Sequence, residues 1–93
     1  MVSISNHPSV ILGDFGEQPI IRGKLKPRLT VAQYDVVQTL LEEGNYGLTK
    51  DQLDDKSGHT DARKILRRLR ESDEDWAAVI HMPGRKGLRY RIG

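Results

Sequence analysis

The segment from His59 to Ser72, with the sequence HTDARKILRRLRES, constrains the fold of this 93-residue chain more than any other. Its apolar residues recur at the i, i+3, i+4 and i+7 spacing of one helix face, namely Ala62, Ile65, Leu66 and Leu69. Five cations occupy the remaining surface, namely Arg63, Lys64, Arg67, Arg68 and Arg70. We therefore expect a helix near residues 61–72 that packs one face into a core. The other face is either a surface for an anionic partner or an ordinary solvated basic face.

Two earlier helices are predicted by capping boxes, in which a threonine and the glutamine three residues later each bond to the other's backbone. The pairs are Thr30 with Gln33, which predicts a helix near residues 30–43, and Thr49 with Gln52, which predicts one near residues 50–56. Ser57-Gly58 ends the second helix, and the basic helix follows within a few residues. Two helices joined by so tight a turn, the second of them basic, indicate a helix-turn-helix.

Short runs rich in valine and isoleucine predict strands at both ends of the chain. Ser9–Leu12 and Pro19–Lys24 predict a strand pair within residues 9–28. At the carboxyl end, Leu88 to Ile92 alternates apolar and basic residues, as a half-buried strand does. With Trp76–His81 as its partner strand, this segment predicts a hairpin over residues 77–92.

The acidic cluster Asp73-Glu74-Asp75 directly follows the basic helix. Acidic groups are unfavourable at the carboxyl end of a helix, because that end carries a partial negative charge. We therefore expect these three residues to form a turn between the basic helix and the hairpin.

The charge of the chain is unevenly distributed. Residues 1–60 hold six Lys/Arg against eight Asp/Glu, whereas residues 61–93 hold nine against five, so the net charges are −2 and +4. The positive charge therefore lies in the carboxyl-terminal third, which favours a local anion-binding surface. The chain has no cysteine, no secretory signal pattern, and no apolar run of the roughly 20 residues that span a bilayer. A cytoplasmic protein without membrane contact is the expectation.

This order of elements resembles the DNA-binding output domain of OmpR-type response regulators, a winged helix-turn-helix. The matching residues are short motifs at helix ends and in the last strand, namely Leu29-Thr30, Leu41, Leu48-Thr49, Gln52-Leu53, Leu69-Arg70 and Tyr90-Arg91-Ile92. The resemblance implies an α+β fold with three helices, a C-terminal β-hairpin wing and an N-terminal strand pair. Residues 1–93 would form a single winged-helix domain, with residues 1–8 flexible and residues 29–93 forming the helices and wing.

The resemblance also implies a DNA-contacting surface, in which the third helix enters the major groove and the wing reaches the adjacent minor groove or backbone. The candidate DNA-binding residues are Thr60, Arg63, Lys64, Arg67 and Arg68 on the helix, and Arg85, Lys86 and Arg89 on the wing. Arg63 and Arg67 lie one turn apart, and arginine is the commonest bidentate reader of guanine. Arg68 and Arg70 are expected to be either phosphate contacts or ordinary surface charges.

No constellation of residues indicates catalysis. His7, His59 and His81 share no metal-ligand spacing, and no glycine-rich phosphate loop is present. We therefore expect no enzyme, no cofactor and no small-molecule substrate. Two functions remain open, which are duplex DNA binding, alone or as a homodimer, and docking onto a protein partner. The acidic pairs Glu42-Glu43 and Asp54-Asp55 are the candidates for the second.

Overall fold

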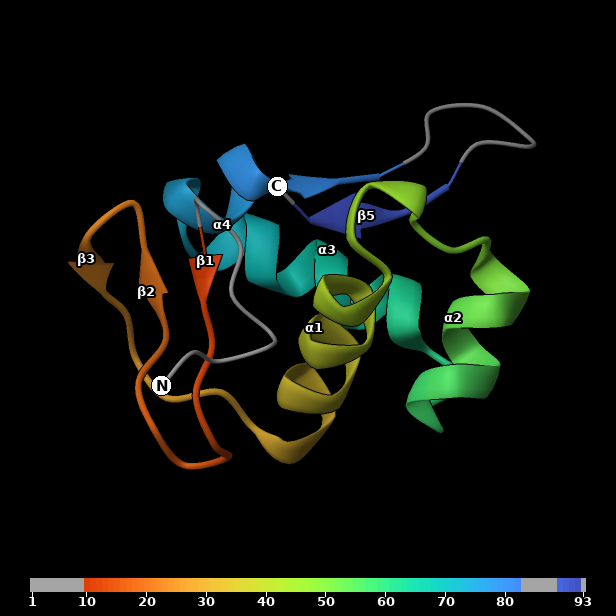
Figure 1. The fold of residues 1–93 in the computed structure, drawn as a ribbon, viewed down its shortest axis with the longest axis horizontal. Coiled ribbons are helices and arrows are strands. Elements are labelled where there is room, and N and C mark those ends of the chain that lie inside the picture. Colours follow the sequence, from red (N-terminus) through yellow and green to blue (C-terminus); the bar gives the residue numbers. More distant parts are fainter. Residues whose placement is uncertain (1–9, 83–88, 93) are drawn as a thin grey trace.

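The computed structural model describes residues 10–82 and 89–92, and the statements below concern these residues. They form a small α+β domain with four α-helices and two small antiparallel sheets (Figure 1). The helices are α1 (Val31–Glu43), α2 (Lys50–Ser57), α3 (Ala62–Ser72) and α4 (Glu74–Val79), with a 3-10 turn η1 (Gly44–Tyr46) between the first two. The strands are β1 (Val10–Ile11), β2 (Ile20–Ile21), β3 (Lys24–Leu25), β4 (Ile80–His81) and β5 (Arg91–Ile92).

Capping boxes begin α1 and α2, as predicted. The Thr30 hydroxyl accepts the Gln33 N–H at 3.2 Å, and the Gln33 side chain accepts the Thr30 N–H at 3.0 Å. Thr49 and Gln52 repeat the arrangement at 3.3 and 3.1 Å. Each box satisfies two backbone donors that a helix start leaves free, so the residue at which each helix begins is set locally.

The N-terminal part forms three strands instead of the predicted strand pair. The order is β1-β2-β3, with Ile11 opposite Ile20 and Ile20 opposite Leu25. The predicted strand Pro19–Lys24 is interrupted by Arg22 and Gly23, whose φ angles are 51° and 83°. Two residues with positive φ suit the tight turn of a hairpin, so the chain reverses here and adds a strand.

The expected turn at Asp73-Glu74-Asp75 and the expected strand Trp76–His81 are wrong. Asp73 is the N-cap of α4, and its carboxylate accepts the Asp75 N–H at 2.9 Å. Glu74 and Asp75 lie in the first turn of α4, where acidic groups complement the partial positive charge of a helix start. The strand begins only at Ile80, after the helix has ended.

The C-terminal hairpin is present in the residues that the structure describes. In the pairing of β4 with β5, Ile80 lies opposite Ile92 and His81 opposite Arg91. Tyr90 exchanges two backbone hydrogen bonds with Leu48, at 2.9 and 2.7 Å, which fastens the hairpin to the connection between α1 and α2. Tyr90 and Ile92 are buried, as the alternation predicted. The expected hairpin tip, Leu88 and the predicted flexible segment 1–8 lie outside the described residues.

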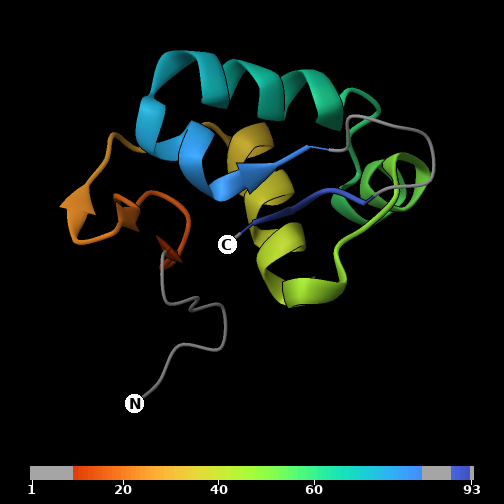
Figure 2. The same cartoon turned by 90° about the horizontal axis from the view of Figure 1, so that it is seen from above.

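The core gathers around α1 and α3. Helix α3 packs against α1, α2 and α4, and α1 also contacts β5. Figures 1 and 2 show the three-stranded sheet and α2 at opposite ends of the molecule, with α1 and α3 between them. The buried apolar residues form one cluster: Val10, Leu12, Ile21, Leu29, Val36, Val37, Leu40, Leu41, Leu48, Leu53, Ala62, Leu66, Leu69, Trp76, Val79, Ile80, Tyr90 and Ile92.

Ion pairs attach the end of the three-stranded sheet to the start of α4. The Lys26 ammonium contacts the carboxylate of Asp75 and lies 3.1 Å from that of Asp73, and Lys24 lies 3.6 Å from Asp75. The hydrogen bond from Lys26 holds the pKa of Asp75 below its ordinary value of 3.8. The same hydrogen bond raises the pKa of Lys26. The ion pair between Lys26 and Asp75 therefore favours the charged form of both residues.

Replacing Lys26 with Met should lower the melting temperature at pH 7, because two carboxylates lose their shared cation. A carboxyl group with a lowered folded-state pKa stabilises the fold above its ordinary pKa, and this contribution is lost as the pH falls through the lowered value. The difference between the parent and Lys26→Met should therefore shrink as the pH falls below about 4. Thermal melts of both proteins from pH 7 to pH 2.5 test this, and a difference that stays constant would contradict the assignment.

Candidate nucleic-acid interface

Helix α3 is amphipathic in the way that its sequence predicts. Ala62 and Leu66 are completely buried, Leu69 is 3% exposed, and Ile65 packs at the margin of the core. The five cations of the helix are all exposed, namely Arg63, Lys64, Arg67, Arg68 and Arg70. Because the apolar stripe is used by the core, the basic face is held outward along the length of the helix.

The start of α3 is fixed by side chains from two other helices. Its own N-cap residue, Asp61, makes no capping bond, and Asp54 of α2 accepts the Ala62 N–H at 3.3 Å instead. His59, in the turn before α3, bonds to the Asp35 carboxylate of α1 through its Nε2 atom at 2.9 Å. Gly58 ends α2 in the left-handed conformation, with a φ angle of 79°. The turn is thus held to α1 and α2, which sets the position of the first basic residues.

Six residues around this turn line a shallow hollow of about 210 Å³, which we call the cationic hollow. They are Lys50 from α2, Thr60 and Asp61 from the turn, and Arg63, Lys64 and Arg67 from α3. The structure thus brings together four predicted site residues. Arg68 does not line the hollow. With four cations and one carboxylate, the hollow carries a strong positive charge.

Lys50 is a site residue that the sequence analysis missed. It is the first residue of α2 and lies close to α3 only because the two helices pack together. Its ammonium lies 3.1 Å from the Asp54 carboxylate, and that hydrogen bond raises its pKa. Its position within the second capping box, directly after Thr49, was the only local signal, and that signal says nothing about contact with α3.

The cations of α3 are free to bind an external anion. Within residues 10–82 and 89–92, no carboxylate lies within ion-pair distance of Arg63, Lys64, Arg67 or Arg68. Their neighbours in the cationic hollow include one acid, Asp61. Like charges held together without compensation repel one another, so a bound anion would relieve this repulsion.

The predicted wing residues are only partly described. Arg85 and Lys86 lie outside the described residues. Arg89 is exposed two residues before β5, and its guanidinium donates to the side-chain oxygen of Gln52 at 3.4 Å. That oxygen also accepts the Thr49 N–H at 3.1 Å in the capping box of α2. Arg89 therefore lies beside the start of α2.

One residue of each acidic pair considered for protein docking has a partner within the domain. Glu43 lies 3.0 Å from the Lys56 ammonium, and Asp54 contacts both Lys50 and the start of α3. Among the described residues no group of three or more His, Cys, Asp or Glu residues is arranged to hold a metal ion. Each acidic pair is therefore partly compensated within the domain, whereas Arg63, Lys64 and Arg67 have no ion-pair partner among the described residues.

None of the helices described here has both the length and the apolar character needed to cross a membrane.

Comparisons with known proteins do not assign this chain to a family. No protein-family model matches the sequence, and neither the curated proteins nor the solved structures contain a match.

Proposed function

We propose that this chain is a DNA-binding winged-helix protein, with α2 and α3 as its helix-turn-helix and β4 and β5 as the base of its wing. The observation that carries the proposal is the cationic hollow, in which Arg63, Lys64 and Arg67 are exposed and have no ion-pair partner among the described residues, whereas Lys50 pairs with Asp54. The fold supports it as well. Two helices separated by four residues are followed by the short helix α4 and then by an antiparallel strand pair, which is the element order of a winged helix with one helix added.

In this proposal α3 lies in the major groove with its amino end nearest the bases. Arg63 and Arg67, one turn apart on the exposed face, reach base edges, and guanine is the base that arginine reads best. Lys64 and Lys50 meet the phosphates on either side, because a lysine ammonium is a point charge suited to a phosphate oxygen. Arg68, which does not line the cationic hollow, makes at most a peripheral phosphate contact.

The role of the wing rests on sequence as well as structure. The bridge between Leu48 and Tyr90 holds the hairpin against the connection that leads into α2. A basic tip at Arg85 and Lys86 would then extend the cationic surface beyond α3. As a regulator of transcription or a DNA-associated accessory protein, the chain would read the base sequence with α3 and gain affinity from backbone contacts of the wing.

Replacing Arg67 with Ala should weaken binding to the preferred duplex by about 1–3 kcal/mol and relax specificity at one base pair. Arg70→Ala is the matched control, because Arg70 also lies exposed on α3 but near its carboxyl end and outside the cationic hollow. The preferred site is first selected from random duplexes, and both variants are then titrated against it and against a random duplex. Equal losses for the two variants would contradict the assignment of Arg67 to base reading.

A further inference from the structure

The outer face of the three-stranded sheet carries a row of apolar side chains. Ile11, Ile20 and Leu25 lie opposite one another in the strand register, so their side chains cross all three strands side by side. Leu25 is 61% exposed and Ile11 45% exposed, whereas Val10 and Ile21, on the inner face, are completely buried. The solvent face of a small antiparallel sheet is ordinarily polar. This row therefore indicates a surface that another molecule covers.

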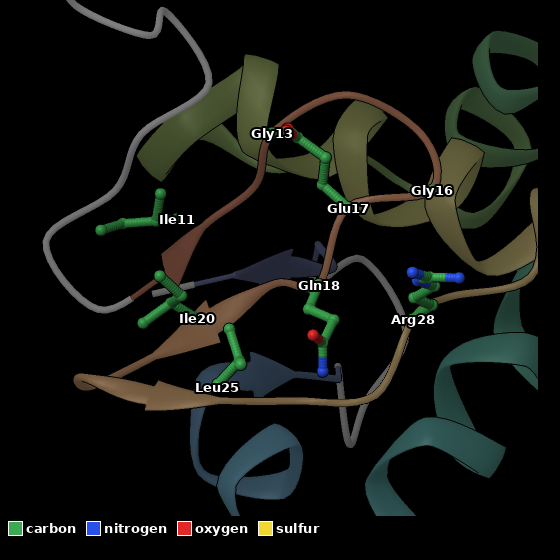
Figure 3. A pocket seen from close by; sticks show the side chains of 8 residues that line it. All are labelled: Ile11, Gly13, Gly16, Glu17, Gln18, Ile20, Leu25 and Arg28. Carbon is green, nitrogen blue, oxygen red and sulfur yellow. The ribbon is translucent and has the colours of Figure 1, made fainter.

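The row forms one end of a hollow of about 490 Å³ (Figure 3). Figure 3 shows Ile11, Ile20 and Leu25 at one end, and Glu17 and Arg28 toward the other. The Glu17 carboxylate accepts the Asp14 N–H at 2.8 Å, which leaves acceptor positions on both of its oxygens. Among the described residues neither Glu17 nor Arg28 forms an ion pair.

We propose that two copies of this chain associate face to face through this hollow, as a symmetric dimer. One acid and one base on the same surface make that surface complementary to itself. A twofold axis running between Glu17 and Arg28 places each Glu17 opposite the Arg28 of the other copy. The same axis passes toward the apolar end of the hollow, so the apolar row of one copy also meets that of the other. A partner of a single charge sign would satisfy only one of the two residues.

The dimer does not depend on DNA binding, and it leaves the DNA surface open. The three-stranded sheet and α2 lie at opposite ends of the molecule (Figures 1 and 2), so the cationic hollow stays exposed in each copy. A standard interface covers about 800 Å² of each partner. Three aliphatic side chains and two ion pairs make a smaller contact, so we expect self-association that is detectable only at about 100 μM or above.

The test is sedimentation velocity of the full chain across a concentration series, with charge reversals at both positions. Glu17→Arg places two arginines opposite each other in both halves of the interface, and Arg28→Glu does the same with two glutamates. Each variant alone should weaken self-association roughly tenfold or more. An equimolar mixture of the two variants should associate as the parent does, because every contact between them again pairs an acid with a base.

Substitutions in the apolar row give a second readout. Leu25→Lys should abolish self-association, whereas Val31→Lys, at a residue that is 57% exposed but outside the hollow, should leave it unchanged. Melting temperatures confirm that the variants are folded. A parent that stays monomeric at about 1 mM would overturn the proposal, as would a mixture of the two reversal variants that fails to associate.

Discussion

Replacing Leu66 with Ala should lower the free energy of unfolding by about 2–5 kcal/mol, because the side chain is fully buried and its removal leaves a cavity in the core. Leu66 lies at the centre of α3, which packs against α1, α2 and α4. A domain of this size has about 5–10 kcal/mol of stability, so this one substitution removes much of it.

Urea unfolding of the parent and the variant measures this loss. Leu25→Ala is the matched control, because it removes the same atoms from a side chain that is 61% exposed. Its cost should stay within about 1 kcal/mol at a protein concentration where the chain is monomeric. Equal costs at the two positions would mean that the apolar stripe of α3 does not face the core.

Replacing Gly47 with Ala should lower the free energy of unfolding by about 2–4 kcal/mol, for two independent reasons. The backbone at Gly47 has φ 67° and ψ −175°, a region that is essentially restricted to glycine. A Cβ atom there would lie 2.5 Å from the Tyr90 carbonyl oxygen, and that carbonyl accepts the Leu48 N–H. The methyl group therefore pushes the hairpin away from the start of α2.

Gly58→Ala is the control for a positive φ without the close contact and outside the region restricted to glycine. Gly58 also has a positive φ of 79°, but a Cβ there would have no atom within 4 Å, and its left-handed conformation is accessible to other residues. Its cost should be about 1 kcal/mol. If Gly47→Ala costs no more than Gly58→Ala, the close approach of the hairpin to the connection between α1 and α2 is contradicted.

The sequence predicted best those features that are decided within one turn of the chain. The two capping boxes gave the starts of α1 and α2, and the apolar spacing from Ala62 to Leu69 gave the buried face of α3. The burial of Tyr90 and Ile92 followed from simple alternation along a strand.

The errors came from signals that have two interpretations. The dipole argument excluded Asp73-Glu74-Asp75 from the end of α3, correctly, but the same argument also favours acidic residues at the start of a new helix. Trp76 and Val79 were interpreted as strand residues, because a short apolar run has no clear period, although their i, i+3 spacing also fits one face of a helix.

Tertiary contacts explain what the sequence left out of the candidate site. Lys50 joins the cationic hollow because α2 packs beside α3, and no local pattern encodes that packing. The contact of Arg89 with Gln52 depends likewise on how the hairpin lies against α2. The charges themselves were visible in the sequence, whereas their partners were not.

The measurement that tests the central claim most directly is the salt dependence of duplex DNA binding by the parent and by Lys64→Ala. The affinity of the parent for a random duplex should fall steeply as the salt concentration rises, because lysine and arginine side chains that bind phosphates release the counterions condensed on the DNA. In a plot of log affinity against log salt concentration, Lys64→Ala should make the slope shallower by about 1. Lys56→Ala, at an exposed lysine that pairs with Glu43, should leave the slope unchanged. No binding by the parent at low salt, or the same slope for all three proteins, would contradict DNA binding through α3.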